Sequence, residues 1–285
     1  MRLAMFEING LTGLAAAEKD DFHGWTEDQP GYPGCLGAIL TAGADLETVG
    51  RKMISQAPAV NPETVRFRPP LARPGKIICL GMNYVAHTQE LGRGDQPDYP
   101  AVFARFATTL VGHREPLIKP AVSDQFDYEG ELALVIGRGG RNITRARALE
   151  HVAAYSIFND ASVRDFQVRG AQWTPGKNFD GTGGFGPWLV TAGSLPPGAR
   201  GLRLTTRLNG QVMQEADTAD MVFDIAEQIV ILSQIMTLEP GDLFITGTPG
   251  GVGLSREPRV FMKDGDECEV EIEGIGVLQN PVRQG

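Results

Sequence analysis

Asp127-Tyr128-Glu129-Gly130-Glu131-Leu132-Ala133-Leu134-Val135-Ile136 joins an acidic segment to an uninterrupted apolar run. A short apolar run that contains branched side chains is typical of a buried β-strand. Alternate residues of an extended chain point to the same side, so Glu129 and Glu131 are expected to lie on one side of this segment. The stretch therefore predicts a strand that begins beside two carboxylates.

Further strands are predicted along the chain. They are the apolar segments at residues 76–80, 152–158 and 242–245 and the alternating acidic and apolar segment at residues 267–274. Apolar residues at helical spacing predict one helix over residues 222–237. The 36 glycines and 19 prolines are spread along the chain, as expected of short strands joined by tight turns. We therefore predict a mixed α/β, β-rich fold.

The chain is expected to consist of a small N-terminal domain at residues 1–73 and a larger catalytic domain at residues 74–285. Proline-containing breaks at residues 57–62 and 69–74 separate a first part rich in Gly and Ala from the remainder. A chain of 285 residues fits one large domain with a smaller appendage. The sequence indicates no role for the first part.

Charge and composition exclude several classes of partner. A net charge of −9 and a pI near 5.0 argue against binding to nucleic acid or to an anionic membrane. No apolar run approaches the roughly 20 residues of a membrane span, and the first residues do not form a signal peptide, so a cytoplasmic protein is expected. Cys35, Cys79 and Cys268 lack the spacing of a disulfide framework or a zinc site, and Cys79 and Cys268 are predicted to lie in the core.

Three carboxylates form a candidate metal site. Glu129 and Glu131 could face one ion, and Asp160 follows another apolar strand as a natural third ligand. Oxygen ligands suit hard divalent cations such as Mg²⁺. The alternative is that Glu129 and Glu131 form the solvent face of an edge strand, which on spacing alone is the commoner arrangement.

Three further motifs suggest catalytic or binding groups. His87 and Glu90 stand at i and i+3 and could form a general base, or an exposed helical ion pair. Lys177 could neutralise an enolate or a carboxylate, or lie on the surface. The loop at residues 246–253 offers backbone amides and the Thr248 hydroxyl to a carboxylate, or is a plain turn, and it lacks a nucleotide-binding pattern.

Taken in order, these motifs closely resemble the fumarylacetoacetate hydrolase family over residues 76–282. The resemblance rests on Gly81-Met82-Asn83-Tyr84 with His87 and Glu90, Tyr128-Glu129-Gly130-Glu131-Leu132, Asn159-Asp160 with Arg164-Asp165, Gly176-Lys177-Asn178-Phe179-Asp180, Leu238-Glu239-Pro240-Gly241-Asp242 and Gly247-Thr248-Pro249. It implies a curved β-roll around the catalytic core, assembled as a homodimer.

The resemblance also implies roles for individual residues. The metal ligands are Glu129, Glu131 and Asp160, with Mg²⁺ as the ion or Mn²⁺ in its place. The catalytic residues are His87, Glu90 and Lys177, with His87 and Glu90 on a lid at about residues 84–100. The substrate-binding residues are Tyr84, Arg105, Arg164, Gln167 and Thr248. Arg105 departs from relatives that carry lysine at this position, which leaves recognition of the distal substrate group open.

The activity that the resemblance implies first is hydrolysis of a carbon–carbon bond in an acylpyruvate or β-diketo acid, in which His87 deprotonates water. Alternatives on the same metal and enolate chemistry are oxaloacetate decarboxylation, keto–enol tautomerisation and isomerisation of hydroxymuconate-type acids. A lyase and a non-catalytic binding protein rank below these. The expected partner is a small 2-oxo acid, and catabolism of aromatic compounds is the setting that the resemblance suggests.

Overall fold

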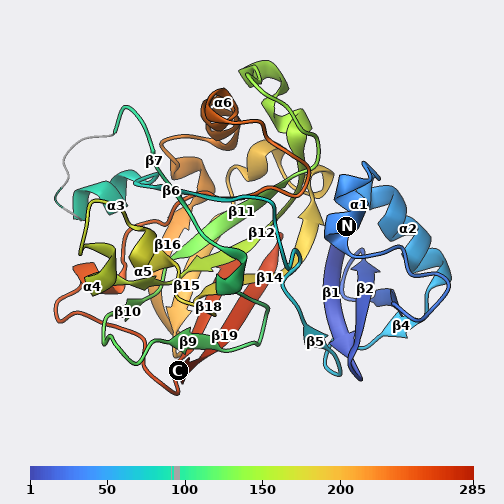
Figure 1. The fold of residues 1–285 in the computed structure, drawn as a ribbon, viewed down its shortest axis with the longest axis horizontal. Coiled ribbons are helices and arrows are strands. Elements are labelled where there is room, and N and C mark those ends of the chain that lie inside the picture. The colour runs from blue at the N-terminus through green and yellow to red at the C-terminus, as the bar shows by residue number, and fades with distance from the viewer. Residues whose placement is uncertain (91, 93–96) are drawn as a thin grey trace.

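The computed structural model describes residues 1–90, 92 and 97–285, and within them the chain forms three β-sheets surrounded by short helices (Figure 1). The predicted mixed α/β, β-rich fold is confirmed. The predicted strands and helix appear as β6 (Ile77–Gly81), β11 (Gly130–Ile136), β12 (Val152–Asp160), β17 (Leu243–Ile245), β18 (Glu267–Ile272) and α6 (Ile225–Ile235).

The N-terminal residues form strands and two helices, drawn from blue to teal in Figure 1. These elements are β1 (Arg2–Ile8), β2 (Leu11–Ala17), β3 (Phe22–Thr26), α1 (Leu36–Thr41), α2 (Leu46–Gln56), β4 (Ala59–Val60) and β5 (Arg66–Phe67). Strand β1 pairs antiparallel with β14 (Gly183–Thr191), so this part continues a sheet of the remaining chain. The division at residue 73 stays a prediction.

The largest sheet has 12 strands among the described residues, in the order β4-β3-β2-β1-β14-β12-β11-β17-β6-β7, with β5 on β1 and β8 on β14. Its remaining strands are β7 (Ala101–Ala104) and β8 (Leu110–Val111). All seven residues of β11 are buried because the strand lies between β12 and β17. Gly130 of β11 pairs with Asn159 of β12, which brings Glu129 close to Asp160.

Two smaller sheets complete the structure. Strand β10 (Phe126–Asp127) pairs with β13 (Ser162–Val163). The other sheet, in the order β16-β15-β18-β19-β9, adds β16 (Gln211–Asp217), β15 (Arg203–Leu208), β19 (Gly276–Gln284) and β9 (Leu117–Lys119). In β18 the apolar residues are buried and the glutamates are exposed or half-buried, as their alternation predicts. Cys79 and Cys268 are free and buried, as predicted.

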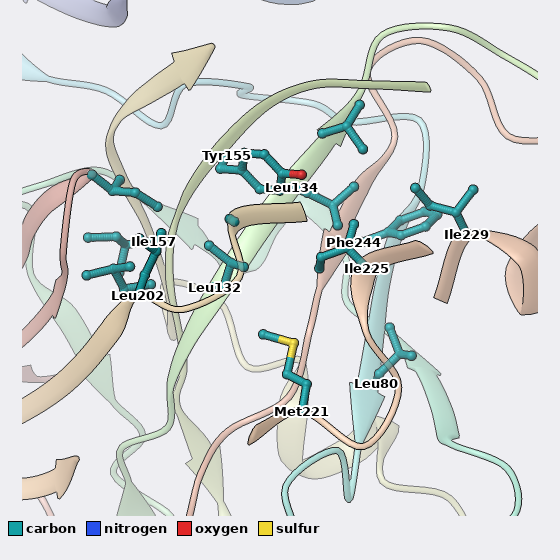
Figure 2. Close-up of a cluster of buried hydrophobic side chains, with 14 of the residues drawn as sticks. Leu80, Leu132, Leu134, Tyr155, Ile157, Leu202, Met221, Ile225, Ile229 and Phe244 are labelled. Atoms are coloured by element: carbon teal, nitrogen blue, oxygen red, sulfur yellow. The ribbon is translucent and has the colours of Figure 1, made fainter. Parts of the chain in front are cut away.

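The main hydrophobic core joins the two larger sheets and helix α6. Figure 2 shows side chains of β11, β12, β17 and α6 packed together, among them Leu134, Tyr155, Phe244 and Ile229. Burying apolar side chains of this size stabilises the fold by about 1.5–3 kcal/mol each. The core therefore fixes the strands whose ends carry the predicted site.

Short helices follow several of these strands. They are α3 (Val85–Glu90), α4 (Arg164–Gln167) and α5 (Thr174–Lys177), and the 3-10 helices Ala107–Thr109, Arg145–His151, Ala192–Ser194, Pro197–Ala199, Thr218–Asp220 and Gly253–Ser255. Helix α3 opens the predicted lid, of which residues 91 and 93–96 lie outside the described residues. Within the described part of the chain, no helix is long and apolar enough to cross a membrane.

Candidate active site

Most of the predicted site residues line one cavity of about 160 Å³ at the ends of β6 and β12 and the start of β11. Its polar wall is made by His87, Glu129, Glu131, Asp160, Arg164, Gln167, Lys177 and Thr248. Its apolar wall is made by Leu80, Met82, Phe103, Val168, Trp173 and Leu254. Segments far apart in the sequence therefore form a single polar site beside an apolar surface.

The carboxylates of Glu129, Glu131 and Asp160 form a buried trio whose candidate ligand atoms all lie within 4.8 Å of one another. The intervening Gly130 packs against the five-stranded sheet, where a Cβ atom would lie 2.1 Å from Thr206 Oγ1. Glycine is required there because no other residue fits, while both glutamates turn to the cavity. The solvent face of an edge strand is thereby excluded as the explanation of the Glu-Gly-Glu motif.

Lys177 lies among these carboxylates rather than on the surface. Its Nζ donates to Glu129 Oε2 and to Asp160 Oδ2, each at 2.5 Å, and the side chain is buried. Burial alone would raise the pKa of Glu129, but the positive charges of Lys177 and Arg164 outweigh it and lower that pKa. Glu129 is therefore held in its ionised form.

Glu131 has different surroundings. Burial, followed by the negative charges of Asp160 and Glu129, raises the pKa of Glu131 well above its ordinary range. Its Oε2 accepts a hydrogen bond from Gly247 N at 2.5 Å, but no salt bridge to a lysine or arginine is found among the described residues. A buried carboxylate without a paired cation is costly.

The balance of buried charges shows whether the trio fits a divalent cation. The site buries four carboxylates, Asp127, Glu129, Glu131 and Asp160, against three cationic side chains, Arg105, Arg164 and Lys177. An added divalent cation would supply the positively charged partner that Glu131 lacks. Three carboxylate oxygens are also the donors that such an ion prefers. The residues present therefore fit a divalent-metal site, held by Glu129, Glu131 and Asp160.

His87 and Glu90 form the predicted pair on helix α3. His87 Nδ1 lies 2.7 Å from Glu90 Oε1, and Glu90 Oε2 accepts from Gly251 N at 2.8 Å. Burial would raise the pKa of Glu90, but the hydrogen bonds from His87 and Gly251 lower it overall. Because His87 lines the cavity, Nε2 is the ring nitrogen that Glu90 leaves for a ligand.

Arg164 and Gln167 form a polar end of the cavity on helix α4. Arg164 donates to Asp127 Oδ2 at 2.8 Å and to Gln167 Oε1 at 3.0 Å, and it forms an ion pair with Glu129 Oε1 at 2.7 Å. Its Nη2 is buried and has no hydrogen-bond partner in the described structure. Arg164 therefore keeps an unpaired donor at this end of the cavity.

Thr248 lines the cavity, but protein groups already use its hydroxyl. Oγ1 donates to Gly130 O at 3.0 Å and accepts from Gln214 Nε2 at 2.8 Å. Gln214 Oε1 in turn accepts from Gly130 N at 3.0 Å. Thr248 thus ties the loop after β17 to the Glu-Gly-Glu segment.

Two predicted substrate-binding residues lie elsewhere. Tyr84 is buried in the main hydrophobic core, since its ring packs among apolar side chains and not in the cavity wall. Arg105 lies behind Asp160, because its guanidinium pairs with that carboxylate at 2.5 Å and its side chain is fully enclosed. Neither residue therefore lines the cavity in this structure.

Several residues of the site were not predicted. Asp127 accepts from the backbone amides of Gly253 and Leu254 as well as from Arg164. Its position beside Glu129 and Glu131 in the sequence could have indicated that it belongs to the site. Gln214 comes from an edge strand and carried no signal in the sequence. Phe103 and Trp173 meet edge to face at 5.5 Å in the apolar wall, a contact between distant segments.

Comparison with known proteins places this geometry in context. Residues 76–283 match the family model described as fumarylacetoacetate (FAA) hydrolase C-terminal. The human protein named oxaloacetate tautomerase FAHD2A, mitochondrial, is 41% identical over 289 residues, which cover 99% of this chain and 91% of that protein.

Two solved structures share the fold over the full length of the chain. Fumarylacetoacetate hydrolase from psychrophilic Exiguobacterium antarcticum is 35% identical with a TM-score of 0.87, and 100% of each chain is covered. Maleylpyruvate hydrolase from Sphingobium sp. SYK-6, in complex with a manganese(II) ion and pyruvate, is 28% identical with a TM-score of 0.81, again with 100% of each chain covered.

Proposed function

The chain belongs to the fumarylacetoacetate hydrolase family, and from this premise we propose that it is a divalent-metal-dependent keto–enol tautomerase of a small 2-oxo dicarboxylic acid such as oxaloacetate. The observation that carries the proposal is that His87 and the trio of Glu129, Glu131 and Asp160 line one cavity of about 160 Å³. Pockets for drug-sized ligands occupy roughly 300–1,000 Å³, so this cavity suits a smaller substrate.

Tautomerisation requires a group that moves a proton to and from carbon. Converting the keto form to the enol removes a proton from the carbon beside the carbonyl group and adds one to the carbonyl oxygen, so no water is consumed and no carbon–carbon bond breaks. His87 can hold that proton at Nε2 because Glu90 engages Nδ1 and keeps the ring in one orientation. Arg164 Nη2 offers a donor to a substrate carboxylate.

We propose Mg²⁺ as the ion held by Glu129, Glu131 and Asp160. When bound, such an ion acts as a Lewis acid that lowers the energy of negative charge on the substrate oxygen. Lys177 stays beside the same carboxylates and adds positive charge at this end of the cavity. The polar wall therefore favours the enolate form of a bound 2-oxo acid.

Tautomerisation replaces hydrolysis as the leading activity because the similarity to a tautomerase is greater. The human oxaloacetate tautomerase is 41% identical, whereas the two hydrolases, from Exiguobacterium antarcticum and Sphingobium sp. SYK-6, are 35% and 28% identical. Hydrolysis remains the second candidate, since both hydrolase structures match the whole chain and the same His87 could deprotonate water. Release of pyruvate from an acylpyruvate substrate is the result that would favour it.

The test compares variants of the histidine and glutamate pair. We expect His87→Asn to lower the rate of oxaloacetate tautomerisation about 100-fold or more, and Glu90→Gln to lower it less, because general-base catalysis contributes roughly 10²–10⁴-fold. His23→Asn is the matched control, since His23 lies in β3 and contacts Ala57 O. Full activity of His87→Asn would refute the assignment of the base.

A further inference from the structure

Arg105 contacts Asp160, one of the three candidate metal ligands, but does not itself line the cavity. Its Nη1 donates to Asp160 Oδ1 at 2.5 Å and to Ala161 O at 3.2 Å. The relative exposure of both side chains is at most 1%. Arg105 therefore binds Asp160 where neither solvent nor a ligand in the cavity competes for it.

The remaining contacts of Arg105 fix the guanidinium in place. Nη2 donates to Thr182 Oγ1 at 2.7 Å, and Nε donates to Thr109 Oγ1 at 3.4 Å. The guanidinium carbon also lies 5.6 Å from the centroid of the Phe158 ring. Because each of its three nitrogens donates a hydrogen bond and its guanidinium lies beside the Phe158 ring, Arg105 cannot turn into the cavity without losing several interactions.

The two oxygens of Asp160 consequently have separate partners. Oδ1 accepts from Arg105, while Oδ2 accepts from Lys177 Nζ, which also donates to Glu129 Oε2. Arg105 thus keeps the carboxylate oriented with Oδ2 on the side of the trio. Groups that orient metal ligands in this way typically contribute 10–100-fold to metal affinity.

We propose that Arg105 is a positioning residue for the metal site, acting through Asp160, and not a residue that binds the substrate. The inference rests on the divalent-metal site of the proposed function. Lysine could carry the same charge, but its ammonium donates from one atom, whereas Arg105 reaches Asp160 and Ala161 through Nη1 and Thr182 through Nη2. Arg105→Lys is therefore expected to weaken metal binding 10–100-fold.

The experiment titrates metal-stripped protein with Mn²⁺ and follows free Mn²⁺ by electron paramagnetic resonance. The wild type, Arg105→Lys and the control Arg114→Lys are compared, since Arg114 forms an exposed ion pair with Glu63 and pairs with none of the trio among the described residues. We expect one site per chain in all three proteins and a raised Kd only in Arg105→Lys. Loss of folding would lower the number of sites, whereas loss of positioning changes the Kd.

A second pair of variants covers the case in which Arg105→Lys fails to fold. Thr182→Val removes the oxygen that accepts from Arg105 Nη2 and donates to Phe179 O, whereas Thr182→Ser keeps it. We expect Thr182→Val to raise the Kd several-fold and Thr182→Ser to leave it unchanged. The proposal would be overturned if a folded Arg105→Lys or Thr182→Val variant bound Mn²⁺ as tightly as the wild type does. Tight Mn²⁺ binding without tautomerase activity would instead contradict the proposed reaction and leave the role of Arg105 standing.

Discussion

Glu129 and Glu131 are both buried and two residues apart, yet their electrostatic surroundings are opposite. Glu129 is paired with Lys177 and Arg164, whereas Glu131 faces Asp160 and Glu129 with one backbone amide as its hydrogen-bond donor. The metal-free protein is therefore stabilised by one of these carboxylates and destabilised by the other.

Substituting each glutamate by glutamine should separate the two effects. In chelator-treated protein we expect Glu129→Gln to lower the free energy of unfolding by about 3–5 kcal/mol, because two buried cations lose a partner. We expect Glu131→Gln to raise it, because glutamine keeps an acceptor for Gly247 N and is neutral, whereas folding must either protonate Glu131 or bury its charge without a paired cation. Urea unfolding measures both.

Metal binding supplies the control for this comparison. Both variants should bind Mn²⁺ more weakly than the wild type, since each loses a ligand oxygen of the trio. The opposite surroundings assigned to the two glutamates would be contradicted if, without metal, Glu131→Gln lost as much stability as Glu129→Gln.

At the level of single residues, sequence motifs predicted the polar wall of the cavity but not its surroundings. The order of motifs placed His87, Lys177 and Thr248 in the cavity, where the structure has them. The same order assigned Tyr84 and Arg105 to the substrate, whereas neither residue lines the cavity, because a motif gives the residue type and not the direction of the side chain. Their directions follow from the core and from Asp160.

Strand β11 and the five-stranded sheet are held together at Gly130. A Cβ atom there would lie 2.1 Å from Thr206 Oγ1 and 2.9 Å from Val270 Cγ1. We expect Gly130→Ala to lower the free energy of unfolding by about 1–3 kcal/mol through overpacking, and also to weaken Mn²⁺ binding by displacing both neighbouring glutamates.

The double variant Gly130→Ala/Thr206→Ala tests whether this contact is the cause. Removing the Thr206 hydroxyl should restore part of the lost stability, and thermal unfolding of both single variants and the double variant gives the coupling energy. Strictly additive effects would show that the clash with Thr206 is not responsible.

Helix α6 offers a prediction that concerns folding alone. Asp224 caps the helix by accepting from Glu227 N at 2.9 Å, and it also pairs with Arg145. We expect Asp224→Ala to cost about 0.5–2 kcal/mol of stability and Asp224→Asn to cost less, since asparagine retains the cap. Mn²⁺ affinity should be unchanged in both, and a change in affinity would mean that α6 acts on the site.

Elements with strong periodicity were predictable, and those defined by tertiary contacts were not. The apolar spacing of α6 and the uniform burial of β11 are visible in the sequence. Helices α4 and α5 are each four residues long, too short for a periodic pattern, and they form because their side chains pair with the site.

The N-terminal strands and the remaining chain meet around His113. Its ring lies 5.3 Å from that of Phe67 in β5, and its Nδ1 accepts from Gln279 N at 3.0 Å in β19. Burial, and then the positive charge of Arg114, lower the pKa of His113 from 6.5 to about 4. His113 is therefore neutral in the folded protein at pH 6.

This shift predicts how stability depends on pH. Between about pH 6.5 and 4 the unfolded chain binds a proton at His113 and the folded protein does not, so the free energy of unfolding falls as the pH is lowered, by about 3 kcal/mol in total. His113→Asn keeps an acceptor for Gln279 N and removes the titration. Urea unfolding at pH 7 and pH 4 should show a smaller loss in the variant, and an equal loss would contradict the role of His113.

At the scale of the molecule, the β-rich fold followed from the strand pattern, whereas the continuity of the sheet did not. Breaks near residue 73 suggested a separate first part, but β1 pairs with β14 across more than 170 residues of sequence. Pairing over that distance depends on which strand edges remain open, and local composition does not encode this. The role of the N-terminal strands in completing the largest sheet became visible only in the structure.

The central claim is that this chain interconverts keto and enol forms at a divalent-metal site without breaking a carbon–carbon bond. The most direct measurement follows the loss of enol oxaloacetate by stopped-flow absorbance with metal-stripped protein, before and after addition of Mg²⁺. Pyruvate is assayed in the same samples, and Mg²⁺ without protein serves as the blank. We predict rapid loss of the enol only with protein and Mg²⁺ together, with no pyruvate above the blank; an equal rate without metal, or pyruvate formed in proportion to the enol lost, would contradict the claim.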